Sequence, residues 1–316
     1  MTHETLWLHG ACRRAAAIDA LGRSAVRRAV ESGQWCAAWP GVLIEVSRAA
    51  EPLTVIAAAL RYAGPDALVT GRTAAHLHGC TAVPPLPVHL LVPYGHWLRA
   101  RPGLVAHNGR PAAEDRDEVA GLPSLRLEPV LSDLLCRDRP QDALAVLDQA
   151  LGLAGDAGRE ALRRRIGDEL ALRADPRGRR RATRLLELGT GRAESPPESW
   201  MLFHLVDVGF PAPEVNWSFD DRDGRQIFRL DLAWPEYRIA LEYDGYLAHL
   251  GREDADQTRQ AALERSGWIV VRARADDLGS LYRVECALDE AFRRRGLVLR
   301  RRPGVLRGQR HREKAG

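Results

Sequence analysis

The sequence predicts an α/β protein of the α+β kind, with helices and strands in separate segments. Apolar residues recur at helical spacing near the N-terminus and at residues 128–188, whereas residues 215–243 alternate apolar and polar residues as strands do. The chain has 316 residues, which is the length of about two average domains. Hydrophobic residues make up 45% and charged residues 28%, so the chain can form ordinary buried cores.

The first domain, residues 1–48, is predicted to be a winged-helix-like module. The expected order is helix, turn, helix and hairpin, with helices at 13–20 and 24–31, strands at 34–38 and 42–46, and turns at Leu21-Gly22 and Pro40-Gly41. Ser24 has the side chain of a helix N-cap. Arg27 and Arg28 fall on the polar face of the second helix, where a DNA-binding module meets phosphates or base edges in the major groove. A solvated helix face explains both arginines equally well.

The middle of the chain is predicted to contain an α/β region at residues 49–125 and a helical linker at 126–192. Helices are expected at 53–62 and 72–77 and a strand at 88–92, and none of them carries a catalytic motif. The linker is rich in arginine, which is typical of solvated helix faces that can also touch a phosphate backbone. Its arginines stand at positions 163, 164, 165, 179, 180, 181 and 184.

Residues 193–297 are predicted to form a domain with an αβββαβ core and a final helix. Ser195 and Glu198 have the spacing of a capping box, which fully explains Glu198 without a catalytic role. The expected helices are at 200–208, 254–266 and 281–295, and the strands at 215–219, 227–234, 238–243 and 268–272. Alternation in the second strand places Phe228, Leu230, Leu232 and Trp234 together on the core face.

Three carboxylates are predicted to share the polar face of two neighbouring strands: Asp231 on one strand, Glu242 and Asp244 on the next. A tight turn at Pro235-Glu236 sets residue 231 opposite residue 240, and a slightly longer turn pairs Asp231 with Glu242 directly. Neighbouring carboxylates repel unless a cation lies between them, and oxygen ligands select Mg²⁺ or Mn²⁺. The competing explanation is a solvated sheet face on which arginines pair with the acids.

The pattern of polar residues in this domain extends over about residues 195–295. It consists of Glu198, Arg229-x-Asp231, Glu242-x-Asp244-Gly245, His249, Asp256-x-x-Arg259, Leu263 and Gly267-Trp268. In these residues and in element order, the segment resembles the endonuclease-like domain related to very-short-patch-repair enzymes, within the PD-(D/E)XK nuclease superfamily. The resemblance implies a restriction-endonuclease-like core in which Asp231 and Glu242 bind the metal and Glu198 adds to the site. It further implies that Asp244 and His249 complete the catalytic site, with His249 as general base, and that Arg259 contacts the substrate.

One position departs from the pattern of the wider superfamily. A lysine follows the second acid by two positions there, whereas this chain has Asp244, and Lys314 is its only lysine. Aspartate at this position is similar to what this branch of the superfamily shows. The group that activates the water therefore stays open, and a non-cleaving domain is the alternative.

The front of the chain carries a second resemblance. Its motifs are Gly33-x-Trp35, Pro40-Gly41-Val42, Thr70-x-x-Thr73-Ala74-Ala75-x-Leu77-His78-Gly79 and Ser132-Asp133-Leu134. These motifs resemble type IV antitoxins of the AbiEi kind. The resemblance implies a winged-helix start that binds operator DNA and a toxin-like partner.

Charge and cysteine usage add expectations about compartment and partners. Residues 293–316 carry a net charge of +9 while the whole chain carries +4, so the basic character belongs to a tail, 298–316, that we expect to be disordered. The five scattered cysteines form no C-x-x-C pair and are expected to be reduced and buried. No stretch approaches the roughly 18 apolar residues of a membrane span, and we expect a cytoplasmic protein.

The sequence thus predicts a metal-dependent DNA endonuclease, using Mg²⁺ or Mn²⁺, with a DNA-binding module in front. The alternative is a non-cleaving DNA-binding regulator or antitoxin. A third interpretation is a metal-free interaction protein in which the acids pair with Arg229 and Arg259. The oligomeric state stays open.

Overall fold

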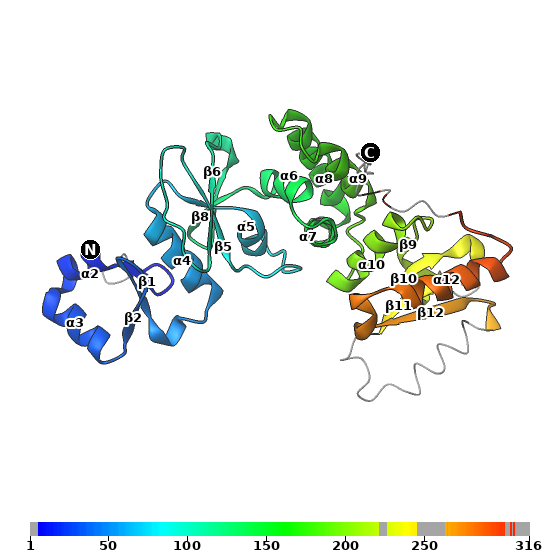
Figure 1. The fold of residues 1–316 in the computed structure, drawn as a ribbon, viewed down its shortest axis with the longest axis horizontal. Helices are drawn as coiled ribbons and strands as arrows, with labels where there is room; N and C mark the ends of the chain where they lie inside the picture. Colours follow the sequence, from blue (N-terminus) through cyan, green and yellow to red (C-terminus); the bar gives the residue numbers. More distant parts are fainter. Residues whose placement is uncertain are drawn as a thin grey trace, which may run out of the picture. The chain divides into compact units, whose positions relative to one another are not determined.

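The computed structural model describes residues 6–220, 226–244, 263, 265–300, 304 and 306. The chain divides into two compact units, Met1–Leu134 (unit 1) and Leu135–Gly316 (unit 2). Helices occur together with sheets of three, four and five strands, which confirms the predicted α+β class (Figure 1). The predicted domain limits at residues 48, 125, 192 and 297 fall inside the two units and stay predictions.

Unit 1 begins with the N-terminal module, a three-stranded sheet with two short helices. Its elements are β1 Ala11–Arg13, α2 Arg14–Leu21, α3 Arg23–Glu31, β2 Trp35–Trp39 and β3 Val42–Glu45, in the sheet order β1-β3-β2. The predicted helices and hairpin are present, and β1 is an additional strand. Gly22 makes the turn between the helices with a φ of +83°, a conformation that favours glycine. Because Gly22 takes the N-cap position, the predicted cap on Ser24 is wrong.

A small hydrophobic core holds the N-terminal module together. It contains Leu6, Cys12, Ala17, Val26, Ala29, Trp35 and Leu43. The rings of Trp7 and Trp35 pack with their centroids 4.8 Å apart. Since α3 has only nine residues, and helices shorter than about 12 residues are marginal alone, this packing rather than helix propensity stabilises it.

The rest of unit 1 is built on a five-stranded sheet with the order β6-β5-β4-β8-β7. The strands are β4 Leu68–Val69, β5 Val88–Val92, β6 Leu104–Asn108, β7 Arg116–Val119 and β8 Leu122–Leu125. Helix α5, Gly71–Leu77, packs against β5. The sequence predicts only β5 and α5 of this set. Strand β6 forms one edge of the sheet and pairs in parallel with β5.

Helix α4, Pro52–Ala63, connects the two sheets of unit 1. It contacts β1, β2 and β3 of the N-terminal module and also β4 and β5 of the larger sheet. Ala57, Ala58 and Ala59 are each 0% exposed, and their small side chains let the helix backbone approach both sheets. Buried Thr54 adds a polar link, because its hydroxyl donates to the carbonyl of His9 at 2.7 Å.

The predicted helical segment consists of helices. They are α6 Leu127–Arg137, α7 Pro140–Leu153, α8 Gly155–Leu172 and α9 Arg179–Leu188. Of these, α7, α8 and α9 pack against one another. Two arginines that the sequence places on solvated faces instead bind carbonyl groups near helix ends. Arg163 donates to the carbonyls of Leu186 and Gly189, and Arg181 donates to that of Leu135 at 3.1 Å. The last carbonyls of a helix have no partner within it, so these arginines satisfy the helix ends.

Asp148 on α7 links the helices to the next part of unit 2. Its Oδ1 accepts hydrogen bonds from the backbone N–H groups of Thr190 at 2.7 Å and Gly191 at 2.8 Å. Its Oδ2 accepts one from the hydroxyl of Ser199 at 2.7 Å. Burial raises the pKa of Asp148, and these three donors act in the opposite direction. One buried carboxylate thus holds two other segments against α7.

The remainder of unit 2 is a four-stranded sheet with the order β12-β11-β10-β9. Its elements are α10 Pro196–Asp207, β9 Glu214–Asp220, β10 Gln226–Trp234, β11 Ile239–Asp244, β12 Ile269–Arg274 and α12 Tyr282–Arg294. They correspond to the predicted αβββ, β and α segments. The predicted helix at 254–266 lies largely outside the described residues. Strands β11 and β12 are parallel, and the other pairs are antiparallel.

The turn between β10 and β11 is longer than the tight turn expected at Pro235-Glu236. Pro235–Tyr237 forms a short 3₁₀ helix, and Leu232 pairs with Leu241. The pairing of residue 231 with residue 240 is therefore wrong. The longer turn places Asp231 level with Glu242. This is the pairing predicted for a slightly longer turn.

Two residues of the predicted tail contact α10. The backbone N–H of Gly304 donates to the carbonyl of Asp207 at 2.7 Å, and that of Leu306 donates to Oδ1 of Asp207 at 3.1 Å. Leu306 is buried. Within the described parts of the chain, no helix is long and apolar enough to cross a membrane.

All five cysteines are free, as the sequence predicts. Burial raises the pKa of Cys12 to about 11 and that of Cys80 to about 12, so both thiols stay protonated at neutral pH. Cys36 is only partly buried and Cys286 is exposed, contrary to the expectation that all five are buried.

The two-sided packing of α4 predicts a large effect of truncating one of its buried side chains. Leu60→Ala should destabilise unit 1 by about 2–5 kcal/mol, because Leu60 is only 5% exposed and its loss leaves a cavity. The matched substitution Leu172→Ala, at an 83% exposed leucine, should change stability by less than about 0.5 kcal/mol. Hydrogen exchange in urea resolves the units separately. Equal effects of the two substitutions would contradict the packing described for α4.

Candidate nucleic-acid interface and acidic cluster

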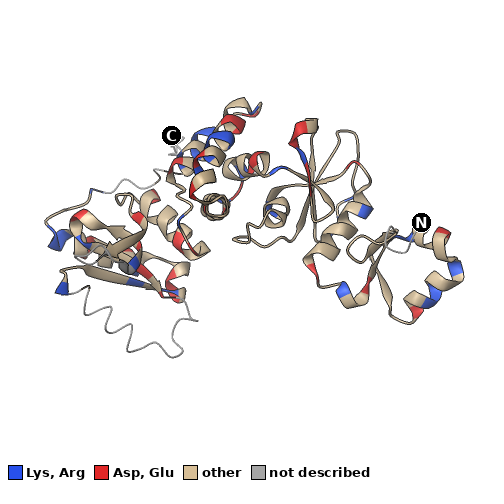
Figure 2. Ribbon diagram, turned by 180° about the vertical axis from the view of Figure 1, so that it is seen from behind, with Lys and Arg blue, Asp and Glu red and all other residues tan. Residues whose placement is uncertain are grey.

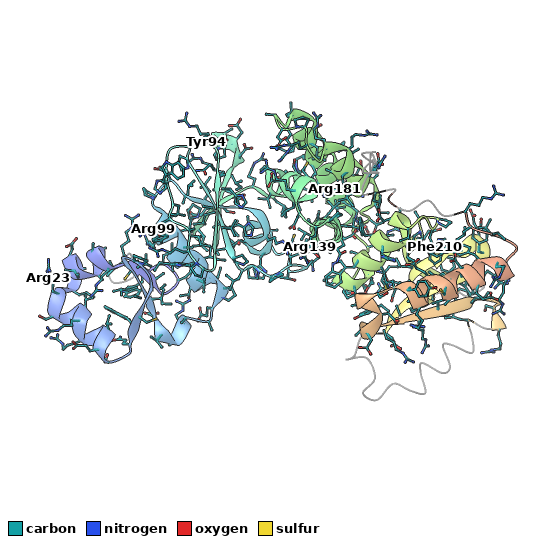
Figure 3. The ribbon with its side chains drawn as sticks, in the orientation of Figure 1. Arg23, Tyr94, Arg99, Arg139, Arg181 and Phe210 are labelled. Carbon is teal, nitrogen blue, oxygen red and sulfur yellow. The ribbon has the colours of Figure 1, made fainter. Side chains whose placement is uncertain are left out.

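Helix α3 presents a basic face to solvent. Its exposed cationic residues are Arg23, Arg27 and Arg28. Val26 and Ala29 on the other side of the helix are buried in the core of the N-terminal module. Figure 2 shows the basic segments along this helix, and Figure 3 labels Arg23 near its start. The predicted exposure of Arg27 and Arg28 is therefore confirmed.

The ion pair on this face is weak. Arg27 lies 3.6 Å from Glu31, and the two side chains are 73% and 65% exposed. Pairs this exposed contribute little to stability, so the guanidinium group can exchange its partner for another anion. Arg23 is not among the predicted contact residues, although it precedes Arg27 by four residues and therefore shares its face.

The β2-β3 hairpin completes the arrangement of a winged helix beside α3. Gly41 makes its turn with a φ of +78°, and β3 is the central strand, pairing with β1 on one side and β2 on the other. An α-helix fits the major groove of DNA, where its polar face meets phosphates and base edges. The geometry of the module is therefore suited to duplex binding.

Glu198 is the most enclosed of the predicted site carboxylates in unit 2, with 6% of its surface exposed. Its Oε1 accepts a hydrogen bond from the hydroxyl of Ser195 at 2.7 Å. Its Oε2 accepts bonds from the backbone N–H of Glu194 at 2.9 Å and from Nδ2 of Asn216 at 3.3 Å. The predicted capping box is altered, because Ser195 makes its side-chain bond with Glu198 and not with the helix backbone.

Glu198 and Asp231 lie close enough to influence each other. Burial raises the pKa of Glu198, the donors from Glu194 and Ser195 lower it, and the charge of Asp231 raises it again. Asp231 is itself held by the backbone N–H of Tyr243, which donates to its Oδ2 at 2.8 Å. Asp231 thus lies between α10 and the end of β11.

The strands are irregular at this point of the sheet. Asn216 has a φ of +50° and interrupts the β9-β10 ladder. Its neighbours Val215 and Trp217 pair with Leu232 and Leu230 of β10. Leu230 packs in a cluster with Trp268, whereas Trp234 contacts Phe292 edge-on, with centroids 5.3 Å apart. The prediction that Leu230 and Trp234 share one core face is therefore wrong. An asparagine inside a strand, a residue type that tolerates positive φ, is the signal that could have indicated this break.

The acids of β11 have arginines beside them. Glu242 is the register partner of Arg272 on β12, and Asp244 is the register partner of Arg274. Such neighbours lie side by side on one face of a sheet, where opposite charges attract. In the same sheet, Arg229 forms an ion pair with Glu194. The metal-free interpretation pairs the site acids with Arg229 and Arg259; the ion pair of Arg229 is with Glu194, and Arg259 lies outside the described residues, so this interpretation stays a prediction.

The structure brings together some of the predicted site residues and leaves others untested. Asp231 lies near Glu198 and level with Glu242, while His249 and Arg259 lie outside the described residues. Within the described ranges, no group of three or more His, Cys, Asp or Glu side chains could hold a metal ion. The described carboxylates have the chemistry of hard-cation ligands but do not by themselves form a metal site.

Comparison with known proteins identifies relatives of most of the chain. Two proteins of Mycobacterium tuberculosis, the uncharacterized protein MT2308 of strain CDC 1551 and the uncharacterized protein Rv2248 of strain H37Rv, are each 32% identical over 255 residues. The aligned region covers 79% of this chain and 89% of each relative. The chain belongs to their family. Residues 67–188 of the chain also match the AbiEi antitoxin C-terminal domain, which confirms the antitoxin-like resemblance.

The matched antitoxin domain runs from the start of the five-stranded sheet to the end of α9. It lies outside the sheet of unit 2, so the expected PD-(D/E)XK resemblance stays a prediction. Among solved structures, the RV2827C protein from Mycobacterium tuberculosis aligns with a TM-score of 0.39 and 17% identity over 67% of this chain and 83% of its own.

Because Asp231 and Glu198 are neighbouring carboxylates, removing the charge of one should change the stability of unit 2 in a pH-dependent way. In metal-free protein at pH 7, Asp231→Asn should stabilise unit 2 by about 1 kcal/mol, because it removes a repulsion and keeps an acceptor for Tyr243. The pKa of Glu198 is raised in the folded state, so its ionised form is destabilising, and this effect disappears as the pH falls through that pKa. The gain from Asp231→Asn should therefore be lost in acid.

Denaturation of unit 2 in EDTA across the pH range measures this difference. Asp19→Asn, at an exposed aspartate on α2, is the control and should have no effect. Destabilisation by Asp231→Asn at every pH would show that Asp231 stabilises the fold through its own partners.

Proposed function

We propose that the protein is a DNA-binding regulator of the AbiEi antitoxin kind that contacts operator DNA through its N-terminal module. The observation that carries the proposal is the exposed arginine face of α3 on a winged-helix-like module, directly ahead of the antitoxin-like domain. A basic helix with a hairpin beside it offers phosphate contacts and access to base edges. The proposal includes a toxin-like partner, as the family resemblance implies, and a cytoplasmic location, where operator DNA is accessible.

In the proposed interface, affinity comes mainly from the positive charge of α3. Three exposed arginines against Glu31 give α3 a net positive face. Phosphate contacts of this kind make affinity depend on salt, with about 0.9 counterions released per contact in duplex DNA. Sequence preference would come from the residues of α3 that reach base edges.

Removal of the α3 arginines should weaken binding to the DNA upstream of the protein's own gene. Arg27→Ala and Arg28→Ala should each reduce the slope of log affinity against log salt by about 0.9, the value for one lost phosphate contact. Fluorescence anisotropy of a labelled duplex at several salt concentrations measures the slope. Arg164→Ala is the matched control, because Arg164 is 67% exposed and forms a similar i,i+4 pair with Glu160 at 3.9 Å. An equal loss in Arg164→Ala, or none in the α3 variants, would refute the interface.

A second proposal is a metal-dependent nuclease centred on Asp231, Glu242 and Glu198. The observation that favours it is that the carboxylate of Glu198 is buried and lies close enough to Asp231 for the charge of Asp231 to raise its pKa, a repulsion that a bound cation would relieve. Under this proposal Asp231 and Glu242 would hold Mg²⁺ or Mn²⁺, and the bound cation would supply Lewis-acid stabilisation during phosphodiester hydrolysis. Asp244 and His249 would then orient and activate the attacking water, and Arg259 would contact the substrate.

The nuclease proposal predicts metal-dependent cleavage of DNA. Labelled linear, nicked and single-stranded DNA should be cut with Mg²⁺ or Mn²⁺ and not with EDTA. Asp231→Ala and Glu242→Ala should abolish cutting, while Asp19→Ala, at an exposed site on α2, should retain it. Intact DNA in every lane, with duplex binding retained, would reject the nuclease and leave the regulator.

A further inference from the structure

The loop between β5 and β6 exposes two large aromatic side chains. Trp97 is 96% exposed and Tyr94 is 63% exposed. Figure 3 labels Tyr94 and Arg99 on this loop. Aromatic side chains are usually buried, and exposed ones grouped on a surface typically mark a binding site. The operator contact proposed for α3 makes no use of them.

The same loop and the edge strand β6 line one hollow of about 560 Å³. Leu104, Ala106 and Asn108 contribute from β6, at alternate positions that share one face of the strand. Tyr94 and Trp97 contribute from the loop. The hollow falls within the size range of small-ligand pockets, about 300–1,000 Å³, and can accept flat rings such as nucleobases.

The charge around the hollow is positive. Arg99 lines it, and none of the lining residues is Asp or Glu. The stretch 93–113 contains three arginines and no Asp or Glu. Both Arg99 and His96 are exposed. The positive charge of this surface therefore favours a negatively charged occupant.

The loop is attached to the core of unit 1 at its far end. Nε of Arg101 donates to the hydroxyl of Tyr62 on α4 at 3.3 Å, and the Tyr62 hydroxyl donates to the carbonyl of Arg99 at 3.5 Å. These bonds position the backbone at Arg99 while its side chain stays in solvent.

We propose that the aromatic-basic surface, formed by Tyr94, His96, Trp97 and Arg99, binds unpaired bases of a single-stranded nucleic acid. Trp97 and Tyr94 stack on bases, and Arg99 contacts the backbone phosphate between them. Aromatic rings beside basic side chains are the combination used by sequence-tolerant single-strand binders. Paired bases hide their ring faces within the duplex, so the surface selects unpaired segments. This proposal does not depend on operator binding through α3.

A fluorescein-labelled oligothymidylate of about twelve nucleotides, within the usual site sizes, tests the surface with the full-length chain. Anisotropy at low salt should show binding, and Trp97→Ala should weaken it about tenfold, the size expected for one lost stacking contact. Trp97→Phe should largely retain affinity because it keeps a ring. Arg99→Ala should weaken binding and lower its salt dependence. A residue as exposed as Trp97 can be replaced without disturbing the core.

Binding measurements on two further variants distinguish this surface from the operator contact. Arg27→Ala should leave oligothymidylate binding unchanged, and Trp97→Ala should leave blunt duplex binding unchanged. Tyr282→Ala, at a 72% exposed tyrosine in unit 2, is the control for loss of an exposed ring and should have no effect. Absence of oligothymidylate binding, or equal affinity of Trp97→Ala and the unsubstituted chain, would overturn the proposal. If Trp97→Ala instead changed only the self-association of the chain, the surface would be a protein interface and the proposal would be wrong.

Discussion

The packing of α4 between two sheets sets the geometry of unit 1. On one side the helix contacts the three strands that support α3, and on the other it contacts β4 and β5. Its buried alanines allow both approaches, and Tyr62 near its end anchors the β5-β6 loop through Arg101. The basic face of α3 and the aromatic-basic surface are therefore both positioned by one helix. Loosening α4 would disturb both.

Charge is used differently in the two units. On α3, arginines lie exposed with at most a weak ion pair, so they remain available to a polyanion. In unit 2, by contrast, Arg272 and Arg274 are register partners of acids in the sheet, and Arg181 binds a carbonyl group at a helix end. The count of arginines in a segment therefore says little about its partners, and the groups around each guanidinium decide whether it can bind DNA.

Local patterns in the sequence predict the regular elements with strong periodicity but not the features set by tertiary context. The helices of the N-terminal module and its hairpin follow from apolar spacing and the glycine and proline turns. Strand β4 has only two residues, β6 shows no apolar–polar alternation, β7 is mostly charged and β8 contains a proline, so none of them gives a clear strand signal. Residue types indicated the carboxylates Asp231 and Glu242 of unit 2, but the longer turn between β10 and β11 and the break at Asn216 set their neighbours. The proximity of Glu198 depends on the docking of α10, which no local pattern encodes.

The site of DNA contact can be mapped by photo-crosslinking operator DNA that carries bromouracil to the full-length chain and identifying the cross-linked peptides by mass spectrometry. We expect cross-links concentrated in α3 and the adjoining β2-β3 hairpin of the N-terminal module. Cross-links confined to the sheet of unit 2, with none in α3, would contradict the proposed interface and assign DNA binding to that sheet.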